Sequence, residues 1–183
     1  MKQENNVLYI LRLTVTLLVI CAVVAAALAG VNAITKDKIA AIQAEKTAKA
    51  ISAVLKNGES AVEVPFQADG AVTKVYKNEN GYAVQVAPSG FGGAITMMVG
   101  VDLEGKVTGI SIISHAETPG LGAVSAANTD KGAAFRDQFK GLVAGITIGT
   151  GSNSIDALSG ATISSQAIVD GVNAALRCVA ELG

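Results

Sequence analysis

The chain has 183 residues, half of them apolar, with 14 lysines and arginines against 15 aspartates and glutamates. A net charge of −1 without a basic cluster argues against a nucleic-acid-binding surface, which needs concentrated positive charge. A single histidine and two cysteines without a Cys-x-x-Cys motif argue against a zinc site or an iron–sulfur cluster held by this chain alone, so no metal is expected.

The first predicted element is a membrane helix within an N-terminal segment, residues 1–35. Residues 13–35 are 23 positions without a charge, and a helix of that length is about 35 Å long, enough to cross a hydrocarbon core of about 30 Å. A cleaved secretory signal peptide is the alternative, because residues 27–29 and 31–33 resemble cleavage sites. The length of the apolar run favours a permanent single-pass anchor, and either interpretation places the rest of the chain on the extracytoplasmic side.

A helical stalk is predicted over residues 36–58. Apolar residues recur there at helical spacing between lysines and glutamates, and the pair Asn57 and Gly58 is expected to end the helix. We expect the stalk to dock on the domain that follows.

Residues 59–183 are predicted to form an α+β domain. Strand-like alternation occurs at 71–77, 82–86, 94–101 and 107–113, and the short turns between these segments indicate an antiparallel meander. Helices are expected over 130–139 and 164–182, the second with one apolar stripe, and a short strand over 143–148. The expected architecture is a mainly antiparallel sheet with helices packed on it.

A turn directly before the last helix has the sequence Asp156-Ala-Leu-Ser-Gly-Ala-Thr162. Its small residues leave the Thr162 hydroxyl accessible, and a phosphate bound there would meet the amides and the dipole at a helix N-terminus. Ser164 and Ser165 either add hydrogen bonds to that phosphate or cap the helix. A polar turn with an ordinary cap and no cofactor is the alternative for the whole segment.

A second motif follows the last strand of the meander and reads His115-Ala-Glu-Thr-Pro-Gly-Leu-Gly122. Its proline and glycine favour a tight turn, and its two glycines let the backbone approach a planar ring. Glu117 and Thr118 offer an acceptor and a hydroxyl for the polar edge of such a ring. An ordinary strand-ending turn is the alternative.

Together the two motifs resemble those of the covalent FMN-binding domain family, which includes the G subunits of Rnf ion-translocating complexes and the C subunits of sodium-pumping quinone reductases. In that family FMN phosphate is esterified to the last threonine of the turn. The resemblance implies a phosphoester between FMN and Thr162. It also implies a flavin site made by the neighbours of Thr162 and by the earlier loop: Ser159, Gly160, Ala161, Ser164, Glu117, Thr118, Gly120, Leu121 and Gly122.

The order of anchor, stalk and short domain resembles the Rnf G subunits over most of the chain. The resemblance implies an electron-transfer subunit of a membrane complex that moves electrons between ferredoxin and NAD and couples this to sodium or proton translocation. The implied partners are the other membrane subunits, especially the D subunit, the flavin transferase needed for maturation, and membrane lipid. We expect an electron relay within a translocase, with no catalytic residue and no independent activity.

Three other functions stay open at this point. The chain is either a component like the C subunit of a quinone reductase, a stand-alone membrane-tethered flavoprotein reductase, or a binding module without redox function. A reductase needs an acid or base, and His115, which we interpret as structural, is the main candidate. Asp156 either bonds to the turn backbone or is recognised by the transferase. We interpret Tyr82, Phe91 and Met97 as packing residues rather than flavin contacts, and residues 89–93 as a bulge.

Overall fold

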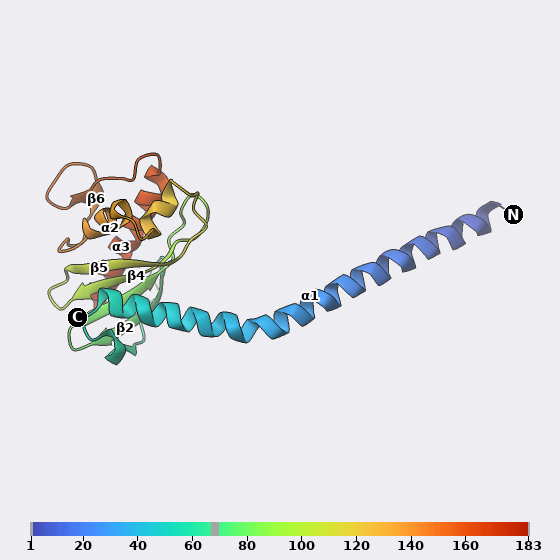
Figure 1. Cartoon of the computed structure of the whole chain (residues 1–183), viewed down its shortest axis with the longest axis horizontal. Coiled ribbons are helices and arrows are strands. Elements are labelled where there is room, and N and C mark those ends of the chain that lie inside the picture. The colour runs from blue at the N-terminus through green and yellow to red at the C-terminus, as the bar shows by residue number, and fades with distance from the viewer. Residues whose placement is uncertain (1, 67–69, 183) are drawn as a thin grey trace. The chain divides into compact units, whose positions relative to one another are not determined.

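A computed structural model describes residues 2–66 and 70–182, apart from the side chains of residues 2–6. The chain divides into two compact units, Met1–Ala44 and Glu45–Gly183, and helix α1 (Lys2–Val54) belongs to both (Figure 1). The helix is unbroken at residue 35, so the predicted anchor and stalk are one continuous helix.

The first unit consists of α1 alone, and its apolar side chains are exposed. The large apolar residues from Val7 to Ile34 are each at least half exposed. By length and composition, α1 is a candidate membrane span. Lipid is the environment in which such exposed apolar side chains are stable, since water makes their exposure unfavourable.

The second unit contains a five-stranded antiparallel sheet in which spatial order equals chain order. Its strands are β1 (Val62–Glu63), β2 (Val72–Asn78), β3 (Gly81–Val86), β4 (Thr96–Asp102) and β5 (Val107–Ser114). The predicted meander is confirmed. In this sheet only β1 was not predicted, because a two-residue strand is too short to show alternation.

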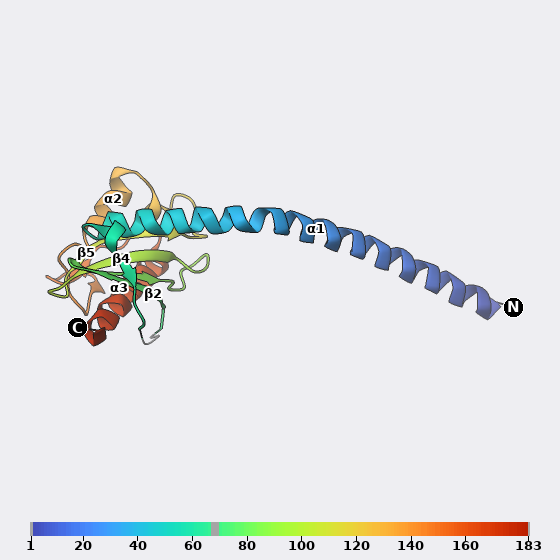
Figure 2. The ribbon, with the colours of Figure 1, turned by 90° about the horizontal axis from the view of Figure 1, so that it is seen from below.

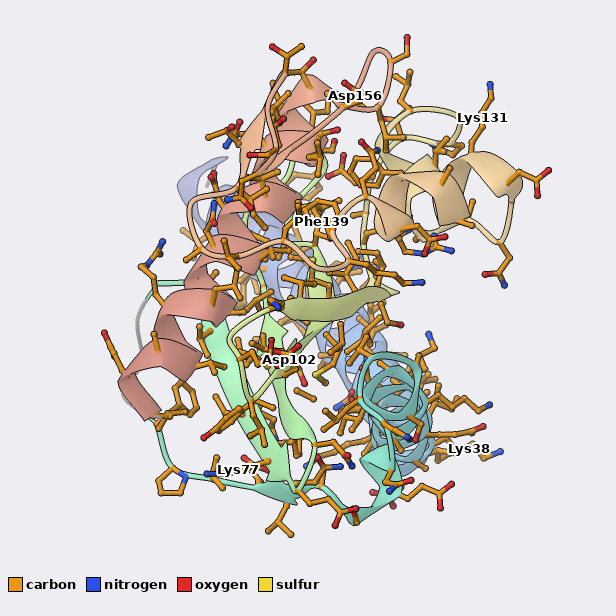
Figure 3. The ribbon with its side chains drawn as sticks, turned by 90° about the vertical axis from the view of Figure 1, so that its left-hand side faces the viewer. Lys38, Lys77, Asp102, Lys131, Phe139 and Asp156 are labelled. Carbon is orange, nitrogen blue, oxygen red and sulfur yellow. The ribbon has the colours of Figure 1, made fainter. Side chains whose placement is uncertain are left out.

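Helices cover both faces of this sheet (Figure 2, Figure 3). Alternate residues of β3 and β4 face helix α3 (Thr162–Leu182), so that Val84 and Met97 share one buried cluster with Ile168. The residues between them face the last turns of α1, where Ala83 and Met98 share a second buried cluster with the end of that helix. The predicted docking of the stalk on the domain is therefore confirmed for its last turns.

A hydrogen bond joins the last residue of α1 to the sheet. The hydroxyl of Thr108 on β5 donates to the carbonyl of Val54. Replacing Thr108 by valine keeps the shape and removes the donor, so we expect the free energy of unfolding to fall by about 1 kcal/mol. Thermal unfolding of the detergent-solubilised protein measures this. Thr73→Val is the matched control, because the Thr73 hydroxyl bonds to a carbonyl at an exposed position; an equal loss in both variants would contradict the docking role.

All but one of the remaining elements lie between β5 and α3. They are a 3-10 helix η2 (Gly122–Ala126), helix α2 (Asp130–Asp137), and two short parallel strands, β6 (Thr147–Ile148) and β7 (Ser154–Ile155); another 3-10 helix, η1 (Gly58–Ser60), follows α1. The strand predicted over 143–148 is confirmed only at its last two residues. In residues 143–146 the backbone amides of Val143, Gly145 and Ile146 donate instead to the side chains of Asn153 and Asn173.

Candidate functional site

A pocket of about 360 Å³ lies where the loop after β5 meets the start of α3. Eight of the ten predicted site residues line it, and the other two, Ser159 and Gly120, do not. Its lining is Phe91, Glu117, Thr118, Leu121, Gly122, Gly160, Ala161, Thr162, Ile163 and Ser164. A more open hollow of about 530 Å³ near Cys178 and Glu181 contains none of the predicted residues. The two sequence motifs thus converge on one place.

Thr162 is the first residue of α3, and it is exposed. The turn before it is closed by a hydrogen bond from the Ala161 amide to the Leu158 carbonyl at 2.9 Å. Gly160 has a φ of 74°, a left-handed conformation that suits glycine, and a Cβ atom there would lie 3.1 Å from Leu121 Cδ2. The absence of a side chain at position 160 therefore lets the turn lie against the second loop.

The helix begins two residues earlier than the sequence predicted, because the Ala161 carbonyl already accepts the first helical hydrogen bond, from the Ser165 amide at 2.9 Å. The amides of Thr162, Ile163 and Ser164 precede that bond and have no acceptor among residues 2–66 and 70–182. Unpaired amides at a helix start attract anions such as phosphate. The site of the predicted phosphate therefore has the donors that it needs.

The two serines of the first turn face inward. Ser165 is fully buried; its hydroxyl accepts from the Leu158 amide at 3.0 Å and donates to the Ala161 carbonyl at 2.9 Å. It stabilises the turn before the helix, but it does not cap the helix, because it accepts from no amide of α3. Ser164 is also buried, and its hydroxyl donates to the carboxylate of Glu117. In this geometry both hydroxyls are engaged within the protein.

The carboxylate of Glu117 joins three segments around the pocket. Its Oε1 accepts from the Gly92 amide at 2.9 Å, and its Oε2 accepts from the Ser164 hydroxyl. The Glu117 amide donates to His115 Nδ1 at 3.2 Å, a local contact of the kind expected for a structural histidine. Glu117 was expected to accept from a bound ring, whereas here its oxygens accept from the protein itself.

Phe91 was predicted to pack in the core or within its loop, and that prediction is wrong. Tyr82 and Met97, grouped with it, are buried in the core, but Phe91 is 71% exposed and lines the pocket. It stands in the bend 91–93, which the bond from Gly92 to Glu117 holds against the site. An aromatic residue flanked by glycines in a polar loop has no neighbouring side chain to pack on. That pattern in the sequence could have indicated that Phe91 would be exposed.

Asp156 is fixed through its backbone, in the loop leading into α3 (Figure 3). Its amide donates to Gln138 Oε1 at 2.7 Å, and its carbonyl accepts from Gln138 Nε2 at 3.4 Å. The exposed carboxylate makes no hydrogen bond within residues 2–66 and 70–182. The first of the two roles predicted for Asp156, a hydrogen bond from its side chain to the turn backbone, is therefore absent from this structure.

These features define a class of protein. Residues 90–177, which include the pocket and its turn, match the FMN-binding domain family. Residues 1–54 match the RnfG N-terminal region, which covers helix α1. The chain is therefore an FMN-binding domain preceded by an Rnf-type N-terminal helix.

Similar proteins identify the family. The chain is 31% identical to the G subunit of the Na(+)-translocating ferredoxin:NAD(+) oxidoreductase complex of Acetobacterium woodii, over 92% of this chain and 90% of the relative. It is 29% identical to the G subunit of the proton-translocating ferredoxin:NAD(+) oxidoreductase complex of Clostridium ljungdahlii, over 97% and 94%. The crystal structure of the C subunit of Na(+)-translocating NADH-quinone reductase from Parabacteroides distasonis resembles it with a TM-score of 0.47 and 18% identity, over 69% of this chain and 75% of the other.

The chain belongs to the G-subunit family of Rnf complexes, the electron-transfer subunits of ion-translocating oxidoreductases that carry an FMN-binding domain. The predicted family, its α+β fold class and FMN as cofactor are confirmed. Membership also makes the chain part of a multi-subunit, membrane-associated complex.

Proposed function

We propose that this chain holds FMN through a phosphoester to Thr162 and relays electrons within an Rnf-type complex. The observation that carries the proposal is the exposed Thr162 hydroxyl at the start of α3, on the rim of the pocket where both motifs meet. The unpaired amides of the first helical turn support a phosphate at that position.

Attachment of the flavin requires an activated donor. The Thr162 oxygen forms a bond to phosphorus and loses its proton, while a phosphorus–oxygen bond to a leaving group breaks. A flavin dinucleotide supplies that leaving group, and a flavin transferase catalyses the exchange. The carboxylate of Asp156, six residues before Thr162, is available to the transferase because it is exposed and makes no hydrogen bond within residues 2–66 and 70–182, while Gln138 holds its backbone in place.

The pocket suits a ring that is only partly enclosed. Its volume of about 360 Å³ lies near the lower end of the range of about 300–1,000 Å³ for ligand pockets. Phe91 and Ile163 expose apolar surface at its rim, and Leu121 does so to a smaller extent. When bound, flavin supplies reversible electron transfer, and the protein supplies position and electrostatics. A partly exposed ring can approach the cofactors of partner subunits.

The proposed setting takes the complex from the relatives and the membrane topology from the sequence. Residues 1–35 contain the N-terminal tail and the helix that crosses the membrane, residues 36–58 form the stalk, and residues 59–183 lie on the extracytoplasmic side. There the flavin exchanges electrons with other membrane subunits, among them the D subunit, as the complex transfers electrons between ferredoxin and NAD. Relatives named for sodium and for proton translocation are similarly close, so the proposal covers either ion.

Co-purification from native membranes tests this role. The affinity-tagged full chain, expressed with its own complex and solubilised in mild detergent, is expected to bring down other membrane subunits and to show flavin fluorescence in a denaturing gel. A fluorescent chain that purifies alone and reduces a soluble acceptor would instead favour the stand-alone reductase. The match of residues 1–54 to the RnfG region favours the Rnf setting over a quinone-reductase component.

Phe91→Ala is expected to make the bound flavin more accessible to solvent. An aromatic side chain that is 71% exposed on the pocket rim can shield a ring without supporting the fold. Iodide quenching of flavin fluorescence should rise in Phe91→Ala, with a thermal midpoint close to that of the wild type. Phe66→Ala is the control, because Phe66 lines the other hollow; equal quenching in all three proteins would exclude shielding by Phe91.

A further inference from the structure

A buried carboxylate borders the pocket without a cation beside it. Glu117 is 6% exposed, and both of its oxygens accept hydrogen bonds, from the Gly92 amide and the Ser164 hydroxyl. Both donors are electrically neutral. Among residues 2–66 and 70–182, the ion pairs all involve other carboxylates, so no lysine or arginine neutralises Glu117.

The backbone packs closely around this carboxylate. A Cβ atom at position 122 would collide with Glu117 Oε2 and with the Ser164 side chain, and one at position 90 would collide with Glu117 Oε1. The backbone at Gly90 and Gly122 therefore closes two sides of the Glu117 carboxylate and leaves no room there for water or a counter-ion. An acidic side chain in which both oxygens accept hydrogen bonds has the arrangement of the ionised form.

We propose that Glu117 is a fixed negative charge that keeps the reduction potential of the flavin in this pocket low; this rests on the proposed binding of FMN there. Adding an electron to a ring beside an anion is unfavourable, and the effect is larger where protein replaces water, because the local dielectric constant is lower. The positive end of the α3 dipole, next to Ser164, stabilises the anion without removing its charge.

A purely structural role for Glu117 predicts a different result, and two variants separate the roles. Glu117→Gln removes the charge but keeps the size, since its carbonyl can accept from Gly92 and its amide can donate to Ser164. Ser164→Ala keeps the charge and removes one hydrogen bond. An electrostatic role predicts a positive shift of the midpoint potential in Glu117→Gln and a clearly smaller change in Ser164→Ala. A structural role predicts the larger change in Ser164→Ala.

The experiment is a spectroelectrochemical titration of the full-length, flavin-loaded protein in detergent, at constant pH and salt. Glu181→Gln is the matched control, because it makes the same charge change on the same helix, 17 residues beyond Ser164 and so about 26 Å along the axis. No shift is expected there, since that distance exceeds the Debye length at physiological salt, about 8 Å. An unchanged or lowered potential in Glu117→Gln would overturn the proposal.

Flavin content is measured first, by fluorescence in a denaturing gel. A wild-type chain without flavin would overturn the proposed function and this inference with it, whereas a flavin-loaded Glu117→Gln without a shift overturns the inference alone. If Glu117→Gln does not load, Glu117→Asp provides the test. It retains the charge, so its potential should stay near the wild-type value, and a clear positive shift would contradict the proposal.

Discussion

Thr162→Ala is expected to leave the chain without covalently bound flavin. Among the described residues, Thr118 and Thr162 are the exposed hydroxyl residues that line the pocket, and Thr162 is the one at the start of α3, where Ser164 is buried against Glu117. Removing the oxygen removes the atom that would form the phosphoester. The measurement is flavin fluorescence in a denaturing gel, together with the intact mass of the chain after co-expression with a flavin transferase.

The fold should be unaffected by this substitution, because an exposed side chain outside any hydrogen bond rarely changes stability by more than about 0.5 kcal/mol. Ser159→Ala is the matched control: its hydroxyl is exposed in the same turn, three residues earlier, but does not line the pocket. Retained fluorescence in Ser159→Ala and its loss in Thr162→Ala support attachment at Thr162. The reverse pattern would move the attachment to Ser159.

Local sequence patterns were enough to predict the sheet, because the residues of each long strand show whether each of its two faces is buried or exposed. In β4, Met97 faces α3 and Met98 faces α1, and both are fully buried, so a continuous apolar run marks a strand covered on both sides. The turns between these strands are short and polar, so strands that follow one another in the chain are neighbours in the sheet. The pair β6 and β7 has no such pattern, because each strand is two residues long and the segment before β6 is held by asparagine side chains.

The candidate site was predicted in composition but not in geometry. The motifs predicted eight of the ten lining residues. They did not predict the contact of Glu117 with Ser164, which joins residues 47 positions apart, or its bond to Gly92, which joins residues 25 apart. Periodicity and turn preferences describe neighbours along the chain, so they cannot show that the glutamate is enclosed by its own protein. For the same reason they could not show that Phe91 would be displayed at the pocket rim.

Phe139→Ala should lower the free energy of unfolding by about 3–5 kcal/mol, several times the loss expected for Thr108→Val. Phe139 is fully buried, and its ring packs edge-to-face on Phe135 with centroids 5.6 Å apart. Truncation leaves a cavity between the α2 segment and the core, and in a unit of this size the thermal midpoint should fall by roughly 10 °C or more. Differential scanning fluorimetry in detergent measures it.

Phe91→Ala is the matched control for that measurement, because it removes the same atoms from a side chain that is 71% exposed. Its midpoint should stay close to the wild type, and an equal fall in both variants would contradict the assignment of Phe139 to the core. Phe139 also adjoins Gln138, whose side chain fixes the backbone of Asp156. Phe139→Ala should therefore lower the yield of flavin attachment as well as stability, since it loosens the segment that leads to Thr162.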